Sequence, residues 1–589
     1  MDYEKNSFPL FFISLLQNVG DSRHIVCPVF GFLCEPQYVL PTTEREGFTS
    51  ISAYFTSGEY NNLELARLEV TGDMLREGRL VIKVPYYYPE SSDKATTKYL
   101  GNLRMKAELD KNCRIYPPLT ILDLNLENEF TYTDAKGNDY PIVITGKRVK
   151  SDKASFVSFS LVGLFDGFVD NDERIIYLYT KDDLSSCKAE GQVSAHAEIV
   201  TDLSVAKNYN EPQKIVIKAH NGKEYEYVTK KAEPVKIRNG FNKESIKSLF
   251  NFDPKSRYGT PDYLDPNVNP SIASIEGKLV VCLGTGATPF YVHGTTGDKL
   301  GEIALGEASP GGIANDDAGN LLIANALSGK GKLRIYRTSS VETAPTLFYE
   351  YDNETALPVG AKLKVNGNID DKAIITLPYS GVTGITEALQ FLHITVEAGK
   401  VTEAKVVDLA PAGLSWGAFS SSSAGFAAAS SDPKDGVFTA SYSYRPNFLN
   451  WLDSSFKIGR SLASTSDLAW AWNTNCLDCK LFNNVEYLAM LVLAHFPQWG
   501  GHPTLYIYNV NNKASLTGEF TDSPALVACS DNVKSLIIKS FNAVNAEDTI
   551  SSGDVTVAQS ADGFKIFVYY YDQYAGAIGG FVADCIKRN

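Results

Sequence analysis

Aromatic side chains gather in one stretch of this sequence, and their chemistry points to ligand contact. All five tryptophans fall between residues 416 and 499. Flat aromatic faces offer sugar rings a large apolar contact, and tryptophan adds a polar N–H. The alternative interpretation is that these rings pack in a core. The candidate ligand-binding residues are Trp416, Tyr444, Trp451, Trp499 and His502.

The segment Gly413-Leu414-Ser415-Trp416-Gly417 matches the G-x-S-x-G turn that carries the nucleophile of many hydrolases. Asp453 and His495 follow it in the usual order of the triad. That motif needs a strand before the serine and a helix after it, whereas residues 418–425 favour helix poorly. A tight turn at a sheet edge is the preferred interpretation, and we predict no catalytic residue.

Two further groups have residue types that bind metals. Cys476 and Cys479 form a single C-x-x-C, which would make a zinc site with His495 and His502. A local disulfide or two free thiols is the preferred alternative, because a second cysteine pair is missing. The acidic stretch 166–172 offers oxygen ligands for calcium, but it also suits a solvated loop. We expect no metal and no cofactor.

The composition describes a folded, acidic, β-rich protein. The formal charge of −14 argues against nucleic acid as a partner, since phosphate binding needs clustered lysines and arginines. Tyr (32) and Phe (30) greatly outnumber Met (4), which favours strands. Nine widely spaced cysteines do not describe a disulfide framework.

The first 47 residues are interpreted as a leader. The apolar run Phe8–Leu16 is too short to cross a bilayer, which takes about 20 residues. It has the length of a signal-peptide core, but acidic residues precede it where basic ones are expected. Cys34 is the candidate for lipidation, although Leu33 before it is larger than usual at such a site. The alternative is an ordinary cysteine in the leader.

Residues 48–148 and 149–236 share one order of strands and turns. In the first segment, a strand at 79–85 ends in proline, and a hairpin turns at 136–138. The second segment repeats this order and turns at 221–223. Two tandem units of this length with short alternating strands predict two immunoglobulin-like β-sandwiches.

Residues 271–589 predict a β-propeller. A turn at 317–320, an apolar strand at 321–324, a turn at 329–331 and a half-exposed strand at 333–336 follow the rhythm of a blade. Six blades is the preferred count, and seven is the competing one. The six units begin near Ile272, Gly312, Leu363, Leu414, Leu462 and Ala525.

Residues 237–270 are predicted to be a linker. Asn242 to Phe250 has the pattern of a short helix, with Asn242 as its cap. Four prolines between residues 254 and 270 favour an extended connection after it. The predicted fold class is therefore all-β, with two tandem sandwiches, a linker and a propeller.

This layout resembles a family of Bacteroidetes surface lipoproteins of unassigned function. The likeness rests on the strand ending in Pro85, on the hairpin at 136–143 and on its counterpart at 221–228, and in layout it spans residues 48–589. The resemblance implies a lipid-anchored protein facing outward on the outer membrane. It further implies two partners, a TonB-dependent transporter of the starch-utilisation type and the lid lipoprotein of that transporter.

Three functions are therefore open. The first is a non-enzymatic accessory protein that binds a glycan or a peptide for the importer. The second is a propeller glycan hydrolase or lyase, which would need two close carboxylates facing one cavity. The third is a structural subunit that contacts only protein partners. A large apolar patch on the sandwiches or on the blade edges would support this third function.

Overall fold

The computed structural model describes residues 47–260, 269–284, 286–380, 388–414, 424–441, 447–464, 466, 472–494, 503–530, 538, 552–573 and 576–588. These residues are mostly strand, with two short α-helices, α1 (Gly72–Glu77) and α2 (Pro254–Tyr258). No helix within them has the length and apolar character needed to span a membrane. The all-β prediction is confirmed. The chain divides into two compact units near Lys231, and residues 179–181 group with the second.

The first eight strands of unit one form two sheets that face one core. The sheet orders are β2-β1-β4-β6 and β3-β8-β7-β5, and β3 runs parallel to β8. Apolar residues from both sheets, such as Ile51 and Ile82, meet in the same buried cluster. This arrangement is a β-sandwich. Its strands are β1 Phe48–Phe55, β2 Glu64–Glu69, β3 Arg79–Pro85, β4 Leu103–Leu109, β5 Arg114–Tyr116, β6 Ile121–Leu122, β7 Asn128–Thr133 and β8 Asp139–Val149.

The next eight strands build a second sandwich around a separate core. The sheet orders are β10-β9-β13 and β11-β12-β16-β15-β14. Phe159 and Ile217, from opposite sheets, belong to one buried cluster. The strands are β9 Phe156–Leu161, β10 Phe165–Asp166, β11 Phe168–Asp170, β12 Ile175–Tyr179, β13 Ala189–Val193, β14 Glu198–Ile199, β15 Lys214–Lys218 and β16 Glu224–Ala232.

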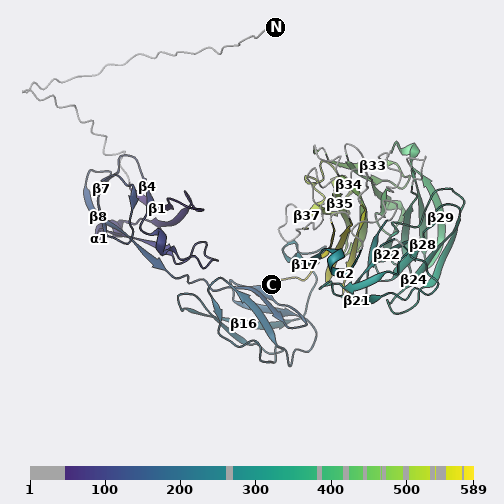
Figure 1. Ribbon diagram of the computed structural model, residues 1–589, viewed down its shortest axis with the longest axis horizontal. Coiled ribbons are helices and arrows are strands. Elements are labelled where there is room, and N and C mark those ends of the chain that lie inside the picture. The colour runs from purple at the N-terminus through teal and green to yellow at the C-terminus, as the bar shows by residue number, and fades with distance from the viewer. Residues whose placement is uncertain are drawn as a thin grey trace, which may run out of the picture. The chain divides into compact units, whose positions relative to one another are not determined.

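The described part of unit two contains six four-stranded sheets (Figure 1). The first three are β18 Ser271–Ile275, β19 Lys278–Cys282, β20 Phe290–His293 and β21 Lys299–Glu302; β22 Gly312–Asn315, β23 Leu321–Ala324, β24 Gly331–Thr338 and β25 Thr346–Asn353; and β26 Lys364–Gly367, β27 Lys372–Pro378, β28 Gln390–Glu397 and β29 Lys400–Asp408.

The next two sheets are β30 Gly425–Ala428, β31 Val437–Ala440, β32 Asn447–Leu452 and β33 Ile458–Ser464; and β34 Trp472–Phe482, β35 Val485–Ala494, β36 Thr504–Asn509 and β37 Leu526–Cys529. The last sheet joins β38 Gly553–Gln559, β39 Lys565–Asp572 and β40 Ala577–Asp584 to β17 Lys247–Phe252.

The six sheets surround a common axis. Each innermost strand contacts the next in a closed ring, in the order β18, β22, β26, β30, β34, β38 and back to β18. The inner strands β18 and β22 are buried on both faces, and so is the second strand β23. Burial on both faces explains the continuous apolar sequence of β23, because it is covered on either side. The predicted β-propeller is therefore present.

The predicted helix over Asn242 to Phe250 is wrong. A single 3₁₀ turn covers Lys243–Ser245, and the chain then extends into β17. The linker prediction fails at the same place, because β17 pairs antiparallel with β40 and completes the last sheet. Phe250 and Phe252 lie near Gly297 of the first sheet, where they would leave no room for a larger residue. This long-range packing overrides the local preference for helix.

Three predicted blade starts are also wrong. Leu414 follows the 3₁₀ turn Ala410–Ala412, and the fourth inner strand begins at Gly425. Leu462 lies on β33, the outer strand of the fourth sheet, and the fifth inner strand begins at Trp472. Ala525 precedes the outer strand β37, and the sixth inner strand begins at Gly553. Leu462 and Ala525 are buried although they lie on or beside outer strands, so an apolar residue at these positions does not mark an inner strand.

Closure by β17 predicts that Phe250→Ala destabilises the propeller. Phe250 is buried and contacts a cluster that includes Ile272 and Tyr569. Removing a buried phenyl ring should cost about 3–5 kcal/mol of unfolding free energy. Thermal unfolding followed by circular dichroism measures the loss. Ser248→Ala, at an exposed position of the same strand, is the control. Equal melting temperatures for the two variants would contradict this role of β17.

Candidate functional site

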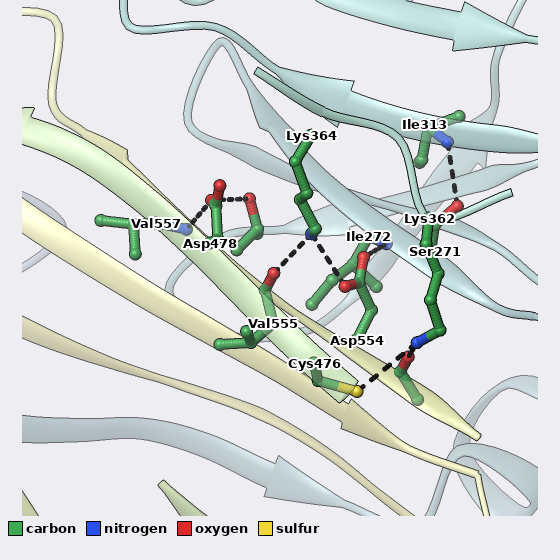
Figure 2. A network of polar contacts seen from close by, with 12 residues as sticks. Ser271, Ile272, Ile313, Lys362, Lys364, Cys476, Asp478, Asp554, Val555 and Val557 are labelled. Carbon is green, nitrogen blue, oxygen red and sulfur yellow. Dashed lines mark hydrogen bonds and ion pairs between the residues drawn. The ribbon is translucent and has the colours of Figure 1, made fainter. Parts of the chain in front are cut away.

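Charged side chains meet on the propeller axis, where the inner strands converge. In a strand, residues two apart point to the same face, so Asp478 and Lys480 of β34 project together. Lys362 has a positive φ just before β26, and Lys364 is the first residue of that strand. We call this group the axial cluster (Figure 2 shows all but Lys480 with labels). Its members are Lys362, Lys364, Cys476, Asp478, Lys480 and Asp554.

One ion pair joins the third sheet to the sixth. The Lys364 ammonium lies 2.8 Å from Oδ1 of Asp554, and the side chains are only 5% and 1% exposed. Lys364 also donates to the Val555 carbonyl at 2.7 Å. The second carboxylate oxygen of Asp554 accepts from the Ile272 N–H at 3.0 Å. Figure 2 shows Lys364 reaching across to Asp554. Three inner strands are tied at this point.

A second ion pair lies on β34. Lys480 contacts Oδ1 of Asp478 at 3.0 Å and donates to the Val365 carbonyl. Oδ2 of Asp478 accepts from the Val557 N–H at 2.8 Å and from the Thr556 hydroxyl at 3.2 Å. Burial alone would lower the pKa of Lys480, but the carboxyls of Asp478 and Asp317 raise it. Lys480 therefore remains protonated.

The third lysine of the cluster, Lys362, is bound mainly by neutral groups. It donates to Asn475 Oδ1 at 3.3 Å and to the Gly553 carbonyl at 3.2 Å. Its ammonium lies 3.7 Å from Sγ of Cys476. Burial raises the pKa of that thiol to about 12, so it stays protonated and unreactive.

Two buried asparagines add uncharged links between the sheets. Asn315 accepts from the Ser274 N–H at 2.9 Å and donates to the Val557 carbonyl at 3.0 Å. Asn366 donates to the carbonyls of Ala428 and Cys479. Together with the ion pairs, these bonds satisfy most polar groups on the axis.

One end of the axis carries two carboxyl groups whose pKa is unusual. Burial raises the pKa of Asp317 to about 7. The positive charge of Lys480 lowers this pKa, whereas the nearby carboxyls of Glu486 and Asp316 raise it. Burial likewise raises the pKa of Glu486 to about 7. Oδ1 of Asp317 is buried and unpartnered within the described residues, and Oδ2 accepts from the Gly367 N–H at 3.1 Å.

The space beside Asp317 is small. Asp316, Asp317, Lys480 and Gln559 are among the residues that line a cavity of about 10 Å³. A single water needs about that much room. The cavity therefore cannot hold a sugar, although a raised pKa would otherwise make Asp317 a candidate general acid.

Most of the predicted ligand-binding residues cannot be compared with this geometry. Trp416, Tyr444, Trp499 and His502 lie outside the described residues, as does the lipidation candidate Cys34.

Trp451, the remaining candidate, is described. It lies on β32, half-buried, and its indole N–H donates to the Asp435 carbonyl at 2.8 Å. Its ring packs beside Gly459 and against a core cluster that includes Leu462. Its role in ligand binding stays a prediction.

The other motifs are resolved where the structure describes them. Cys476 and Cys479 are free thiols in two different core clusters, so they do not share a metal or form the local disulfide. Asp170 caps a turn by accepting from the N–H groups of Asp172 and Glu173. Among the described residues, no group of three or more His, Cys, Asp or Glu could hold a metal. Ser415 of the G-x-S-x-G match lies outside them.

The axial cluster was not predicted from the sequence. A signal was present, because two charged residues stand two apart at Asp478-Cys479-Lys480, on β34, and at Lys362-Leu363-Lys364, where β26 begins. Asp316 stabilises a turn and also links two sheets. Its carboxylate accepts from the N–H groups of Ala318 and Asn320, and it also holds the N–H of Ile369 on the neighbouring sheet.

Family models match along most of the chain. Residues 260–584 match the model described as "Domain of unknown function (DUF8500)", which is more than half of the 589 residues. The chain belongs to this family. Domains of unknown function DUF5018 and DUF8499 match residues 32–146 and 156–233. Thus the DUF8500 region includes the propeller from β18 onward, and the other two include the sandwich strands. No curated protein matches the chain.

Solved structures resemble this DUF8500 protein only distantly. A DUF4623 family protein from Bacteroides eggerthii has 15% identity and a TM-score of 0.37, covering 74% of this chain and 99% of its own. An α-L-arabinanase from Penicillium chrysogenum has 12% identity and a TM-score of 0.33, covering 60% and 99%. Regucalcin from Agrobacterium tumefaciens has 10% identity and a TM-score of 0.30, covering 55% and 94%. Similarity this low carries no functional argument.

The axial ion pairs predict a large effect of Lys364→Met on stability. This change leaves the Asp554 carboxylate buried without its partner, which should cost about 3–5 kcal/mol. Denaturant unfolding of the propeller measures the loss. Adding Asp554→Leu should recover part of it, because both charges are then removed. Lys372→Met, an exposed lysine on the same sheet, is the control. A Lys364→Met variant as stable as this control would contradict the assignment.

The raised pKa of Asp317 predicts that stability falls with rising pH. The folded state keeps the proton to about pH 7, whereas the unfolded carboxyl loses it near pH 4, so unfolding free energy decreases between these values and is lowest above pH 7. Asp317→Asn should reduce this dependence and stabilise the propeller at pH 8, by on the order of 2–4 kcal/mol. Unfolding at pH 5 and pH 8 tests this. Exposed Glu354→Gln is the control, and an unchanged pH profile in Asp317→Asn would overturn the prediction.

Proposed function

We propose that this protein is a non-enzymatic accessory protein of an outer-membrane nutrient importer, and that its propeller binds a glycan or peptide. The observation that carries the proposal is the filled propeller axis. Asp554 and Asp478 are neutralised by Lys364 and Lys480, and the carboxyl of Asp317 faces a cavity of only about 10 Å³.

A glycan hydrolase is the less favoured alternative. Inverting enzymes keep two carboxyl groups roughly 6.5–9.5 Å apart across the substrate, and retaining enzymes roughly 5–5.5 Å. Both arrangements need a cavity that admits a sugar between the two groups. The described part of the axis offers charged side chains without such a space, and this favours binding over turnover.

The sandwiches are proposed to connect the propeller to its partners. Exposed large apolar side chains are frequent on unit one, for example Tyr116 at 70% and Val157 at 69% exposure. Such side chains suit contact with protein. They would also suit the alternative that this chain is a structural subunit contacting only protein partners. The partners we propose are a TonB-dependent transporter and its lid lipoprotein, with a lipid on Cys34 anchoring the chain at the cell surface.

Two finer points of architecture belong to the same proposal. We take both sandwiches to be immunoglobulin-like, because each sets two mainly antiparallel sheets around one core. We take the described six sheets to be the complete set of blades, because their inner strands already close a ring.

Binding without turnover is the expected result when the purified chain meets a panel of soluble glycans and peptides. Calorimetry reports binding, and product analysis of the same samples reports turnover. Trp451→Ala and Trp499→Ala should each weaken binding about tenfold or more, since buried aromatic contacts dominate such sites. Tyr116→Ala, an exposed ring on the first sandwich, is the matched control.

The possible outcomes distinguish an accessory binding protein, a glycan-cleaving enzyme and a structural subunit. Released product would refute the accessory role and direct attention to carboxylates. Binding that survives both tryptophan changes would refute the proposed residues while keeping the role. An absence of binding, with the chain co-purifying with a transporter, would favour the structural subunit.

A further inference from the structure

A groove on the rim of the propeller has an unusual charge. It lies between the outer part of the second sheet and the β28–β29 hairpin of the third, with a volume of about 510 Å³. We call it the rim groove. Its lining residues are Arg337, Thr346, Leu347, Phe348, Tyr349, Gly399, Lys400 and Val401.

The backbone holds the two walls in place. One wall is β25, where Ile335 pairs with Tyr349 and Tyr336 with Leu347, so Phe348 is the extra residue of a β-bulge. The other wall is a tight hairpin whose two turn residues, Ala398 and Gly399, both have positive φ. A bulge breaks the regular spacing of an edge strand and disfavours pairing with an added peptide strand. The groove must therefore select its ligand by side chains.

Both charged residues that line the groove are cations. The chain as a whole carries 69 acidic against 55 basic residues, so a site with two cations and no acid opposes the general trend. Arg337 is positioned by Asp370, which lies 2.5 Å from its guanidinium and does not line the groove. Lys400 faces Glu397 across the hairpin but forms no ion pair among the described residues. Its charge is available to a ligand.

The remaining wall is apolar and aromatic. Leu347 is 52% exposed, and Phe348, Tyr349 and Val401 are partly buried against the core of the second and third sheets. Rings held in this way keep a fixed surface with little entropy left to lose on binding. The volume falls in the range of small-ligand sites, roughly 300–1,000 Å³.

We propose that the rim groove binds an anionic sugar residue of the uronate type. Its carboxylate would bind Lys400 and Arg337, and the apolar face of its ring would lie against Phe348 and Tyr349. Charge-assisted bonds to the carboxylate supply selectivity over neutral sugars. This inference rests on the proposed ligand-binding role and names a ligand class for it.

The test is calorimetry of the full chain with a short oligogalacturonate and with its fully methyl-esterified form. The acidic form should bind, more weakly at high salt, and the neutral ester should bind much less. Lys400→Gln should weaken binding of the acid roughly tenfold, as expected for the loss of one charge-assisted bond. Lys457→Gln, an exposed lysine on another sheet, is the matched control and should bind normally.

Several results would overturn the inference. Equal binding of acid and ester, or full binding by Lys400→Gln, would show that the groove does not select a carboxylate. Binding of a poly-glutamate peptide in place of the sugar would refute the ligand class. If neutral glycans bind in a Trp451- or Trp499-dependent way and the acid does not, this inference fails and the proposed function stands. If nothing binds, both fail.

Discussion

The pairing of buried charges on the propeller axis is the constraint on which the architecture depends. An ammonium or a carboxylate withdrawn from water is tolerated only when an opposite charge and hydrogen bonds replace the lost hydration. Lys364 and Asp554 satisfy this condition only if the third and sixth sheets keep their places. Lys480 contributes in the same way through the Val365 carbonyl. These ion pairs and hydrogen bonds join specific atoms of different sheets, so they fix the positions of the inner strands. Apolar contacts alone would permit small shifts between neighbouring strands.

The same constraint leaves little room for a ligand in the described part of the axis. A propeller can place its chemistry in a central cavity, but here lysine side chains occupy that space and leave about 10 Å³ beside Asp317. Substrate access along the axis would require breaking at least one buried ion pair, at a cost of several kcal/mol. Binding at the rim or on the connecting segments carries no such cost. A closed axis of this kind supports the proposed accessory role over turnover.

The sequence predicted most of what depends on local pattern. The strand at Leu321–Ala324 and the strand ending at Pro85 both lie where their apolar runs indicated. The assignment of outer and inner strands failed at Leu462, because this leucine is buried although it lies on an outer strand. β17 was missed because its pairing partner lies more than 300 residues away, beyond any local signal. The ion pair of Lys364 with Asp554 was missed for the same reason, since these residues meet only after the ring has closed.

Strand order places the rim groove and the cavity beside Asp317 at the same end of the propeller. In each four-stranded antiparallel sheet, the first and third connections lie at one end and the second at the other. The rim groove includes Gly399, in the third connection of its sheet, and the cavity on the axis includes Asp317, in the first connection of another. An anionic sugar held by Lys400 would therefore bind at the end of the ring that carries the buried carboxyl of Asp317, outside the closed axis.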